Sequence, residues 1–415
     1  MALLVQKYGG TSLGTLDRIQ HVAKKIIAAK GQGHQVVVVV SAMYGETDRL
    51  VRLANALTHF PDPREYDVLV STGEQVSMAL LSIALNHHGC RSRSFTGAHV
   101  GIHTDTTHTK ARIIDVKTDL IQRELANHHT VIVAGFQGIN AQGDITTLGR
   151  GGSDTTAVAI AVALKADECQ IYTDVDGVYT TDPHLLQEAR LLPQISFEEM
   201  LEMASLGSKV LQMRSVELAD RHNMPIRVLS SFSDNPGTLV TFEDNIMEKR
   251  LVSGIAFSRE EAIISISGVP RQVGIEGRIL SEISAANIEI DMIAQNITAQ
   301  DTVDFTFTVQ RREFARALSV IEGLAHELGA ISVKTNAKVA KLSLVGIGMR
   351  SQPGVATTMF QSLGKAGIHI QMITTSEIKI SVIMNETHLE QGVRAVHQAF
   401  ELDKVPQIPV QAIIE

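Results

Sequence analysis

Hydrophobic residues in the first half of the chain follow two patterns, which are short continuous apolar runs and longer segments with helical spacing. Residues 36–40 are five consecutive valines, and residues 130–136 form a second apolar run. Runs of this kind are typical of strands buried on both faces of a parallel sheet. Residues 16–30 and 64–88 have helical spacing instead. Strands that alternate with helices predict an α/β domain built on a parallel sheet.

The last third of the chain is an internal duplication. An offset of 80 positions pairs Gly268 with Gly348 and Met292 with Met372. Each copy reads strand, glycine-containing turn, helix, strand, strand, helix, strand, which predicts a ferredoxin-like βαββαβ unit used twice. A polar segment near residues 230–250 precedes the repeat and is interpreted as a linker. A duplicated small module beside a catalytic domain is commonly regulatory, although it could serve only for dimerisation.

Composition narrows the possible classes of protein. The 415 residues predict two or three domains, and the net charge of −8 gives no support for a nucleic-acid or membrane partner. Two cysteines exclude a disulfide framework, and the histidines at 99, 103 and 108 lack an acidic or cysteine partner at ligand spacing, so we expect no metal site there. The apolar runs are too short to cross a bilayer, and the first residues do not resemble a signal peptide. A cytoplasmic location is therefore expected.

A glycine-rich segment follows the second apolar run. It reads Thr-Leu-Gly-Arg-Gly-Gly-Ser-Asp over residues 147–154 and leads into the apolar helical run 157–164. Glycines allow backbone N–H groups to approach a ligand closely, and a helix N-terminus favours negative charge. Arg150 adds a planar, permanently charged group that suits a carboxylate or a phosphate. We predict that this loop holds the reacting ends of two anionic substrates.

Two other predicted strands end in loops that carry polar groups. Lys7 precedes Gly9 and Gly10, which suits an anion-binding turn but differs from a P-loop, in which the lysine follows the glycines. A tight turn with a solvated lysine is the alternative. Ser41 and Thr47 follow the valine run, at an edge where ligands bind in open α/β sheets. Thr47 could equally cap the next helix.

Several further charged residues are candidates with two interpretations each. Glu74 could bind a substrate ammonium group or lie on a solvated helix face. Three aspartates at a strand end, within residues 171–183, suggest Mg²⁺ organisation or contacts with ribose and purine, although Asp-Gly and Asp-Pro pairs also form turns. Lys209 is expected in the first turn of a helix, where the macrodipole disfavours a cation, and this favours a functional role.

Taken together, these motifs resemble the aspartate kinases (aspartokinases) of the amino-acid kinase fold over essentially the whole chain. The repeat resembles the tandem ACT domains through which members of the family sense lysine and threonine. The matching segments are residues 7–12, 147–154, 173–183 and 197–200. The resemblance implies a three-layer αβα kinase domain with a mostly parallel sheet over residues 1–235, a linker over 236–260, and ferredoxin-like ACT domains over 261–337 and 338–415.

The activity implied by the resemblance is transfer of the γ-phosphoryl group of ATP to the β-carboxylate of L-aspartate, with Mg²⁺, giving 4-phospho-L-aspartate for lysine, threonine and methionine biosynthesis. Such a carboxylate is already ionised at neutral pH and needs no general base, because its pKa is about 4. The chemical difficulty is to bring two anions together while charge builds on the transferring group. Cations and backbone N–H groups are the expected catalysts.

The resemblance assigns the site residues to three groups. The catalytic group is Lys7, Arg150 and Asp154, in which Asp154 holds Lys7 in place. Aspartate is expected to contact Thr47, Glu74, Arg150, Gly151, Gly152 and Ser153. ATP is expected to contact Lys7, Tyr8, Gly9, Gly10, Ser41, Thr173, Asp174, Tyr179, Thr180, Thr181, Asp182, Pro183 and Lys209, and the hydroxyl groups of Thr11 and Ser12 are expected beside Lys7.

Feedback control by lysine, threonine or both is implied through the ACT domains, which are also expected to form a homo-oligomer. Arg271 departs from the family pattern, because an acidic residue that meets the effector's ammonium group is common there, and altered control is expected. A shorter subunit could arise from an internal start near Met247. The expected effector-binding residues are Glu289, Ile290, Asp291, Gln295, Val355, Ala356, His369, Ile370 and Ser376.

Two other functions compete with this interpretation. Another amino-acid kinase of the same fold would explain the glycine loops but not the tandem repeat. A non-catalytic amino-acid sensor would keep the repeat and lose the catalytic residues, whereas Lys7, Arg150, Asp154 and Asp174 are all present.

Overall fold

The structure, a computed structural model, describes residues 1–206, 210–242 and 251–404. The chain forms two compact units. The first comprises Met1–Val178, Leu191–Ser205 and residues 210–242. The second comprises Tyr179–Arg190 and residues 251–404. Lys209, Met247 and the last strand expected for the second ACT copy, after residue 404, lie outside the described residues.

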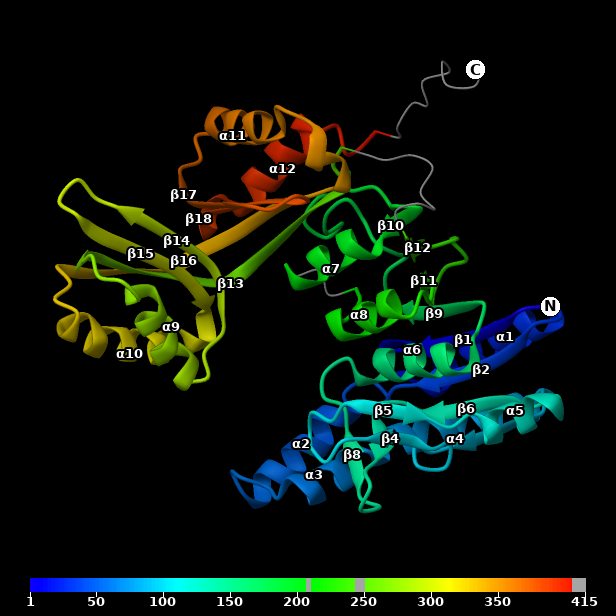
Figure 1. Cartoon of the computed structure of the whole chain (residues 1–415). Coiled ribbons are helices and arrows are strands. Elements are labelled where there is room, and N and C mark those ends of the chain that lie inside the picture. Colours follow the sequence, from blue (N-terminus) through cyan, green and yellow to red (C-terminus); the bar gives the residue numbers. More distant parts are fainter. Residues whose placement is uncertain (207–209, 243–250, 405–415) are drawn as a thin grey trace. The chain divides into compact units, whose positions relative to one another are not determined.

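An eight-stranded sheet forms the centre of the first unit (Figure 1). Neighbouring strands are parallel except that β12 runs antiparallel to β11. The predicted mostly parallel sheet is therefore confirmed, and β12 extends it beyond the predicted boundary at residue 235. In spatial order the strands are β10 (Gln194–Ser196), β12 (Thr238–Thr241), β11 (Ile226–Ser230), β9 (Glu168–Thr173), β1 (Leu3–Tyr8), β2 (Gln35–Val40), β6 (Thr130–Ala134) and β3 (Ser92–Phe95).

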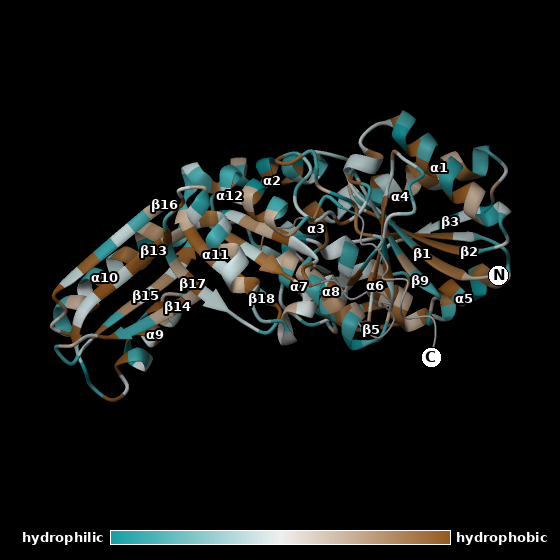
Figure 2. Cartoon of the chain, turned by 90° about the horizontal axis from the view of Figure 1, so that it is seen from above, coloured by the Kyte–Doolittle hydropathy of each residue, from teal (hydrophilic) through white to brown (hydrophobic). Residues whose placement is uncertain are grey.

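Helices cover both faces of this sheet because alternate residues of its buried strands point in opposite directions. Val38 of β2 packs in a cluster with Ile26 and Leu81 on one face, whereas Val39 lies beside Gly135 and Ser153 on the other. The strands are predominantly hydrophobic, and α1 has hydrophilic residues on its outer surface (Figure 2). The helices are η1 (Thr11–Leu13), α1 (Leu16–Gly31), α2 (Glu46–Leu57), α3 (Pro63–Val70), α4 (Thr72–His87), α5 (Asp119–Ala126), α6 (Gly152–Leu164), α7 (Phe197–Ser205) and α8 (Met213–Arg221).

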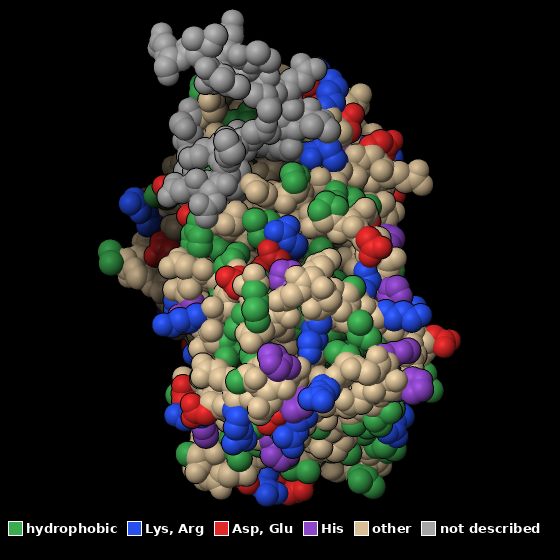
Figure 3. Space-filling view, turned by 90° about the vertical axis from the view of Figure 1, so that its right-hand side faces the viewer, with side chains coloured by type: hydrophobic (Ala, Val, Ile, Leu, Met, Phe, Trp, Pro, Cys, Tyr) green, Lys and Arg blue, Asp and Glu red, His purple; other side chains and the backbone are tan. Residues whose placement is uncertain are grey.

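The helix expected over residues 64–88 is divided, because α3 ends at Val70 and α4 begins at Thr72. By length and composition the stretch Pro63–His87 could cross a membrane, but 50% of its apolar window is buried inside the unit, as in the core helices of soluble proteins. On the face of the molecule that Figure 3 shows, the side chains of Lys and Arg are interspersed with those of Asp and Glu.

A small four-stranded sheet in the same unit carries the approach to the glycine-rich loop. Its last strand ends at Thr147, the first residue of the Thr-Leu-Gly-Arg motif. In spatial order the strands are β5 (Ile113–Val116), β4 (Ile102–Thr104), β7 (Gln137–Ile139) and β8 (Ile145–Thr147).

The second unit contains both ACT copies in one six-stranded antiparallel sheet. In spatial order the strands are β14 (Ile290–Ile297), β15 (Thr302–Gln310), β13 (Gly254–Pro270), β16 (Ser332–Val345), β18 (Lys379–Asn385) and β17 (Ile370–Thr375). Helices α9 (Ile275–Ala285) and α10 (Phe314–Glu327) belong to the first copy, and α11 (Val355–Lys365) and α12 (Leu389–Ala399) to the second; the short helices are η3 (Arg311–Glu313), η4 (Ile347–Ser351) and η5 (Glu386–His388).

Strand β13 is shared between the two copies. Its first part, from Gly254 to Ser258, pairs with the end of β16 and contributes Ile255 to the core of the second copy. This part takes the position beside the first strand that the fourth strand of a βαββαβ unit occupies. The predicted linker over residues 236–260 is therefore wrong at its end, because residues 254–260 are already strand.

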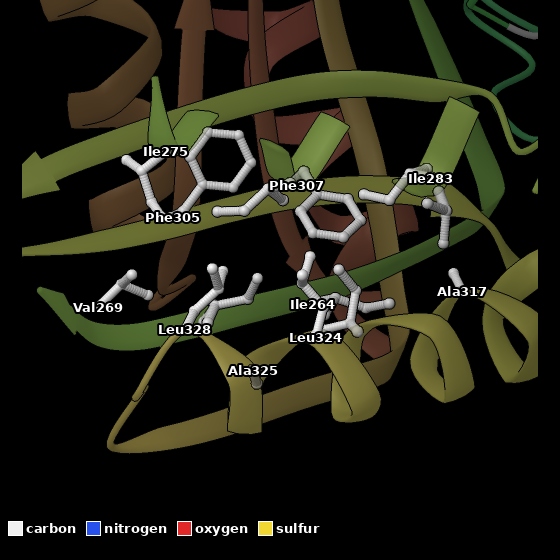
Figure 4. Packing of buried hydrophobic residues seen from close by; sticks show 14 of the residues in the cluster. Ile264, Val269, Ile275, Ile283, Phe305, Phe307, Ala317, Leu324, Ala325 and Leu328 are labelled. Atoms are coloured by element: carbon white, nitrogen blue, oxygen red, sulfur yellow. The ribbon is translucent and has the colours of Figure 1, made fainter. Parts of the chain in front are cut away.

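Each ACT copy has its own hydrophobic core between sheet and helices. In the first copy, Phe305 and Phe307 of β15 lie among aliphatic residues of α9, α10 and β13, including Ile275 and Leu324 (Figure 4). Leu342 and Leu344 of β16 face the corresponding core of the second copy. On the opposite face of the sheet, Met292 and Met372 join a third, smaller cluster.

A buried cation lies on that opposite face. Lys341 of β16 is 3% exposed, its Nζ lies 3.3 Å from Glu261 Oε1, and it also pairs with the half-exposed Asp291. Glu261 and Lys341 occupy equivalent positions of the two copies, given the offset of 80. Burial raises the pKa of Glu261, and the charge of Lys341 opposes that rise. The pair thus brings opposite charges of the two copies together in the interior.

Replacement of Lys341 by Met is expected to lower the free energy of unfolding by about 1–3 kcal/mol, because it leaves the Glu261 carboxylate buried without its cation. The loss should be larger at pH 8 than at pH 5. A raised carboxyl pKa means that stability is lost as the pH rises through it, and without Lys341 that pKa rises further. Urea unfolding at both pH values measures the difference. Lys338→Met, at an exposed position of the same strand, is the control, and equal losses in the two variants would contradict the expectation.

Candidate active site

Lys7 and Asp154 meet at the carboxyl edge of the first unit's sheet. Lys7 is near the end of β1, and Asp154 is in the first turn of α6. Lys7 Nζ lies 2.6 Å from Asp154 Oδ1, and the two side chains are only 12% and 10% exposed. An ion pair shielded from water in this way holds the ammonium group in one place. The structure thus brings together the two residues that sequence reasoning had paired.

The glycine-rich loop presents Arg150 at the start of α6, as predicted. Gly149 and Gly151 have φ values of 77° and 73°, in the left-handed region that favours glycine. Arg150 lies between them with an exposed side chain, and Gly151 is the N-cap of α6. Ser153 is buried in the first turn of that helix, where a Cβ on Gly135 would come within 2.8 Å of its Oγ.

Glu74 is a buried carboxylate beside this edge. It lies in the first turn of α4 and is 3% exposed. Its Oε1 accepts a hydrogen bond of 3.1 Å from Ala42 N, and its Oε2 has no hydrogen-bond partner among the described residues. Burial raises the pKa of Glu74 to about 7, and the Ala42 N–H opposes the rise. The solvated-face interpretation is therefore wrong, and the site holds a carboxylate that an incoming cation would satisfy.

Three residues near the site, Thr47, Ser12 and Ser41, carry hydroxyl groups. Thr47 lies inside the first turn of α2, whose N-cap is Gly45, so Thr47 is not the cap. Ser12 Oγ lies 2.6 Å from Ser231 Oγ in the interior. Ser41 donates its backbone N–H to Tyr8 O at 3.1 Å.

The predicted nucleotide side begins at the end of β9. Thr173 Oγ1 donates to Asp174 Oδ1 at 3.0 Å, and both residues lie in the first unit. Asp176 accepts hydrogen bonds of 2.6 Å and 2.8 Å from Ser233 Oγ and Asn235 Nδ2. It therefore organises a loop, and the three aspartates of this segment do not gather into one cluster among the described residues.

The side chain of Tyr8 lies in the interior of the first unit. Its ring is fully buried and stacks on Tyr172, with the ring centroids 4.5 Å apart. The Tyr8 side chain is therefore part of the core, which leaves only its backbone for a contact with a nucleotide.

Residues 179–183 belong to the second unit. Thr180 is fully buried, and its Oγ1 lies 3.0 Å from His397 Nε2 and accepts the Arg190 N–H at 3.0 Å. Thr181 is buried as well, and Asp182 accepts the His184 N–H at 2.8 Å in a turn. The hydroxyl of Thr180 is committed inside this unit, which leaves only its backbone for the predicted contact with ATP. The assignments to the ATP site of Tyr179, Thr180, Thr181, Asp182 and Pro183 stay predictions.

Phe136 is a residue with a strained backbone at this edge, and the sequence did not predict a role for it. Phe136 has φ of 68°, which is uncommon for a residue with a bulky side chain. Its N–H donates to Thr156 Oγ1 at 3.1 Å, and its carbonyl accepts the Leu148 N–H at 2.9 Å. Phe136 thus ties the end of β6 to the start of α6. No feature of its neighbours in the sequence indicated this role.

Comparison with known proteins identifies the family. Residues 2–230 match the amino acid kinase family, and residues 264–323 and 342–400 match the ACT domain. An aspartate kinase of Pseudomonas putida is 57% identical over 404 residues, which cover 97% of this chain and 98% of that protein. The chain belongs to the aspartate kinases. This kinase is also 47% identical to an aspartokinase of Mycolicibacterium smegmatis over 97% of both chains.

Solved aspartate kinases have the same fold as this kinase. The structure of Escherichia coli aspartokinase III with aspartate and ADP, in its R-state, is 25% identical with a TM-score of 0.79, over 96% of this chain and 99% of that one. The same enzyme with lysine and aspartate, in its T-state, has a TM-score of 0.76 at the same identity and coverage. These matches confirm the predicted kinase domain followed by two ACT domains.

Proposed function

We propose that this kinase transfers the γ-phosphoryl group of ATP to the β-carboxylate of L-aspartate, which gives ADP and 4-phospho-L-aspartate. The observation that carries the proposal is that the carboxyl edge of one sheet holds both the shielded Lys7–Asp154 ion pair and the buried, incompletely bonded carboxylate of Glu74. The former supplies a fixed cation for phosphate oxygens, and the latter supplies an anion for an amino group. Escherichia coli aspartokinase III, which has the same fold, has been solved with aspartate and ADP.

The acceptor side is formed by Glu74, Arg150 and Thr47. Arg150 grips a carboxylate of aspartate with its planar guanidinium group, and Glu74 receives the α-ammonium group on its free Oε2. Gly151, Gly152 and Ser153 contribute the N-terminus of α6, which favours the negative charge of the substrate. The β-carboxylate is left facing Lys7 and needs no proton removed before it attacks.

The donor side is formed by Lys7 and the ends of β1, β2 and β9. Lys7 stabilises the charge that builds on the transferring group, and Asp154 keeps the ammonium from moving away as that charge develops. A Cβ on Gly9 would lie 3.4 Å from Lys7 Nζ, so the glycine keeps the backbone close to the same place. Gly10, Ser41, Thr173 and Asp174 are the further residues proposed for the ATP site in the first unit.

Mg²⁺ is expected to arrive with ATP and to be held mainly by phosphate oxygens and water, with one carboxylate from the protein. Asp174 fits that role, since Asp176 is committed to Ser233 and Asn235. The bound ion would neutralise charge on the β- and γ-phosphoryl oxygens. Asp174 would hold the ion on the same side of the site as Lys7, so that the nucleotide is oriented toward that lysine.

A coupled assay for ADP release across aspartate, glutamate, acetylglutamate, carbamate and nucleoside monophosphates tests the proposal. We expect release with aspartate alone. Release with another acceptor would indicate a different amino-acid kinase, and release with none would indicate a non-catalytic sensor. The proposed product, 4-phospho-L-aspartate, would be used for lysine, threonine and methionine biosynthesis in the cytoplasm.

The ACT copies are proposed to bind lysine, threonine or both in a homo-oligomer. Arg271, which stands where the family commonly has an acidic residue, forms an ion pair with Asp301. Glu276 of α9 provides an acidic group nearby, because its Oε1 accepts a hydrogen bond of 2.7 Å from Nε2 of the predicted effector residue Gln295. Asp291 pairs with Lys341. Val355 is buried at the start of α11, while Glu289, Gln295, His369 and Ser376 are exposed and Ile290, Ala356 and Ile370 are half-buried.

Replacement of Glu276 by Gln is expected to weaken effector binding about tenfold or more, because the ammonium group of the effector loses an ionic partner. Calorimetry with lysine and with threonine, singly and together, measures the change. Glu322→Gln on α10 of the same copy is the matched control. If the Glu276 variant binds lysine and threonine with unchanged affinity, the ammonium group of the effector does not contact Glu276. If neither amino acid gives a heat of binding with the unaltered enzyme, the proposal that the ACT copies bind them is contradicted.

A further inference from the structure

Asp67 of α3 has a fully buried carboxylate and is not among the residues proposed to bind aspartate, ATP or an effector. Its side chain is 0% exposed. Oδ1 accepts a hydrogen bond of 2.5 Å from Thr147 Oγ1, and Oδ2 accepts one of 2.8 Å from His108 Nδ1. Both carboxylate oxygens lie within 3.1 Å of Thr109 N. A single side chain thus binds the last residue of β8 and the loop that follows β4.

That loop is strained where Asp67 holds it. Thr109 has φ of 67°, a conformation that β-branched residues adopt rarely and that persists only where the surrounding contacts impose it. The N–H of the same residue is the one that Asp67 accepts. A negative charge fixed in the interior therefore maintains a backbone conformation that the local sequence does not favour.

The strained loop lies directly against the glycine-rich loop. A Cβ on Gly149 would be 3.1 Å from the carbonyl oxygen of Thr109, and Ala111 N donates to Thr147 O at 2.9 Å. Arg214 of α8 joins the same two segments, because it donates to Leu148 O at 2.7 Å and to Ala111 O at 3.1 Å. The backbone on the amino-terminal side of Arg150 is thus held from several directions, and Asp67 is the deepest of these anchors.

Arg150 depends on these anchors more than an ordinary surface arginine does. It is exposed and lies between two glycines with positive φ, so its own neighbours restrict the backbone weakly. Its position relative to Lys7 and Glu74 must therefore come from the segments that pack beneath the loop. A displacement of about 1 Å in a residue that positions substrate can change rates by about a hundredfold.

We propose that Asp67 is a positioning residue for the aspartate-binding side of the site, which it orders through Thr109 and Thr147. This inference rests on the proposed function, in which Arg150 grips aspartate. The ATP side is formed by the ends of β1, β2 and β9, none of which Asp67 contacts through a hydrogen bond or ion pair among the described residues. Loss of the anchor therefore raises the KM for aspartate and leaves the KM for ATP unchanged.

Two adjacent threonines of β8 provide a matched test. Thr147→Val removes the hydroxyl that Asp67 accepts, and Thr147→Ser retains it. Thr146→Val is the control, because Thr146 is equally buried but its hydroxyl lies 2.5 Å from Thr104 Oγ1 instead. Asp67→Asn removes the charge itself. Aspartate and ATP KM values, kcat and the thermal midpoint are measured for each variant by the coupled assay and by scanning fluorimetry.

We expect the aspartate KM to rise about tenfold to a hundredfold in Asp67→Asn and by a smaller factor in Thr147→Val, with normal values in Thr147→Ser and Thr146→Val. In an Arg150→Ala background, Asp67→Asn should add no further change in the aspartate KM. Lower thermal midpoints with unchanged KM values, or equal rises in both KM values, would overturn the proposal. If Asp67→Asn does not fold, the Thr147 pair decides.

The unaltered enzyme is assayed first, so that the two proposals can fail separately. Absence of ADP release with aspartate would contradict the proposed function. Normal release in the unaltered enzyme, combined with a normal aspartate KM in Asp67→Asn and Thr147→Val, would contradict only the positioning role.

Discussion

Replacement of Lys7 by Met is expected to lower kcat about a thousandfold while the KM for aspartate changes little. The ammonium group of Lys7 is held 2.6 Å from Asp154 Oδ1 in a largely buried place, so it does not need to reorganise when charge builds on the transferring phosphoryl group. Water that enters the space left by the lysine can reorient only partly, and it carries no net charge. The effect should therefore fall on the transition state rather than on substrate binding.

A control for this prediction is Lys25→Met. Lys25 lies on α1 and pairs with the exposed Asp234 at 2.9 Å, so its loss removes a surface ion pair that contributes little. Because Lys7→Met leaves Asp154 without its cation, the double variant Lys7→Met with Asp154→Asn should restore stability without restoring kcat. Initial rates with saturating aspartate and ATP give kcat, and thermal scans report folding. Near-normal turnover in Lys7→Met would contradict the assigned role.

Replacement of Glu74 by Gln is expected to raise the KM for aspartate by about a hundredfold or more, because the α-ammonium group would lose a desolvated ionic partner. The carboxylate is 3% exposed, and its Oε2 has no hydrogen-bond partner among the described residues. An amide of the same shape retains packing and the hydrogen bond from Ala42 N. The difference between the two side chains is therefore mainly the charge.

The pH dependence of the same variant is a second, independent consequence. The raised pKa of about 7 means that Glu74 is partly protonated below neutral pH, so the aspartate KM of the unaltered enzyme should rise as the pH falls below 7. Glu74→Gln should lose this dependence. The KM for ATP should not change with pH over the same range in either protein, and a pH-independent aspartate KM in the unaltered enzyme would contradict the assignment.

As the pH rises, the stability of the substrate-free enzyme should fall, whereas its affinity for aspartate should increase. A carboxyl pKa raised from 4.5 to about 7 on folding means that stability is greatest below pH 4.5 and is lost as the pH rises through 7. Ionised Glu74 thus costs about 3 kcal/mol in the substrate-free enzyme at pH 8, and Glu74→Gln removes that cost. Thermal midpoints at pH 5 and pH 8 test this, with a gain expected at pH 8. Saturating aspartate should stabilise the unaltered enzyme and have little effect on the variant.

The local elements were predictable from sequence because their signals are local. The valine run became β2, the helical spacing before it became α1, the helical spacing over residues 64–88 became α3 and α4, and the glycine-rich segment became the loop before α6. The duplication likewise showed that one βαββαβ unit occurs twice. Individual site residues such as Lys7 and Arg150 came chiefly from the family resemblance, since neither spacing nor composition separates a substrate ligand from a solvated side chain.

Two segments serve parts of the fold that are distant in sequence, which the sequence did not predict. The first half of β13 completes the sheet of the second ACT copy, although it precedes the first copy in sequence. Thr180 follows the nucleotide-side strand closely, yet its hydroxyl lies against His397 in the second unit. Periodicity reports which residues are buried, but it does not report the partner against which they are buried.

The sequence by itself determined the fold class, the repeat and the family, because each depends on the order and type of residues along the chain. Tertiary structure alone decided that Glu74 is desolvated and that Asp67 binds Thr109 and Thr147. The physical reason is that the charge state of a carboxylate depends on the dielectric environment and on the donors that distant segments bring to it. Those quantities exist only once the strands have paired and the helices have packed on them.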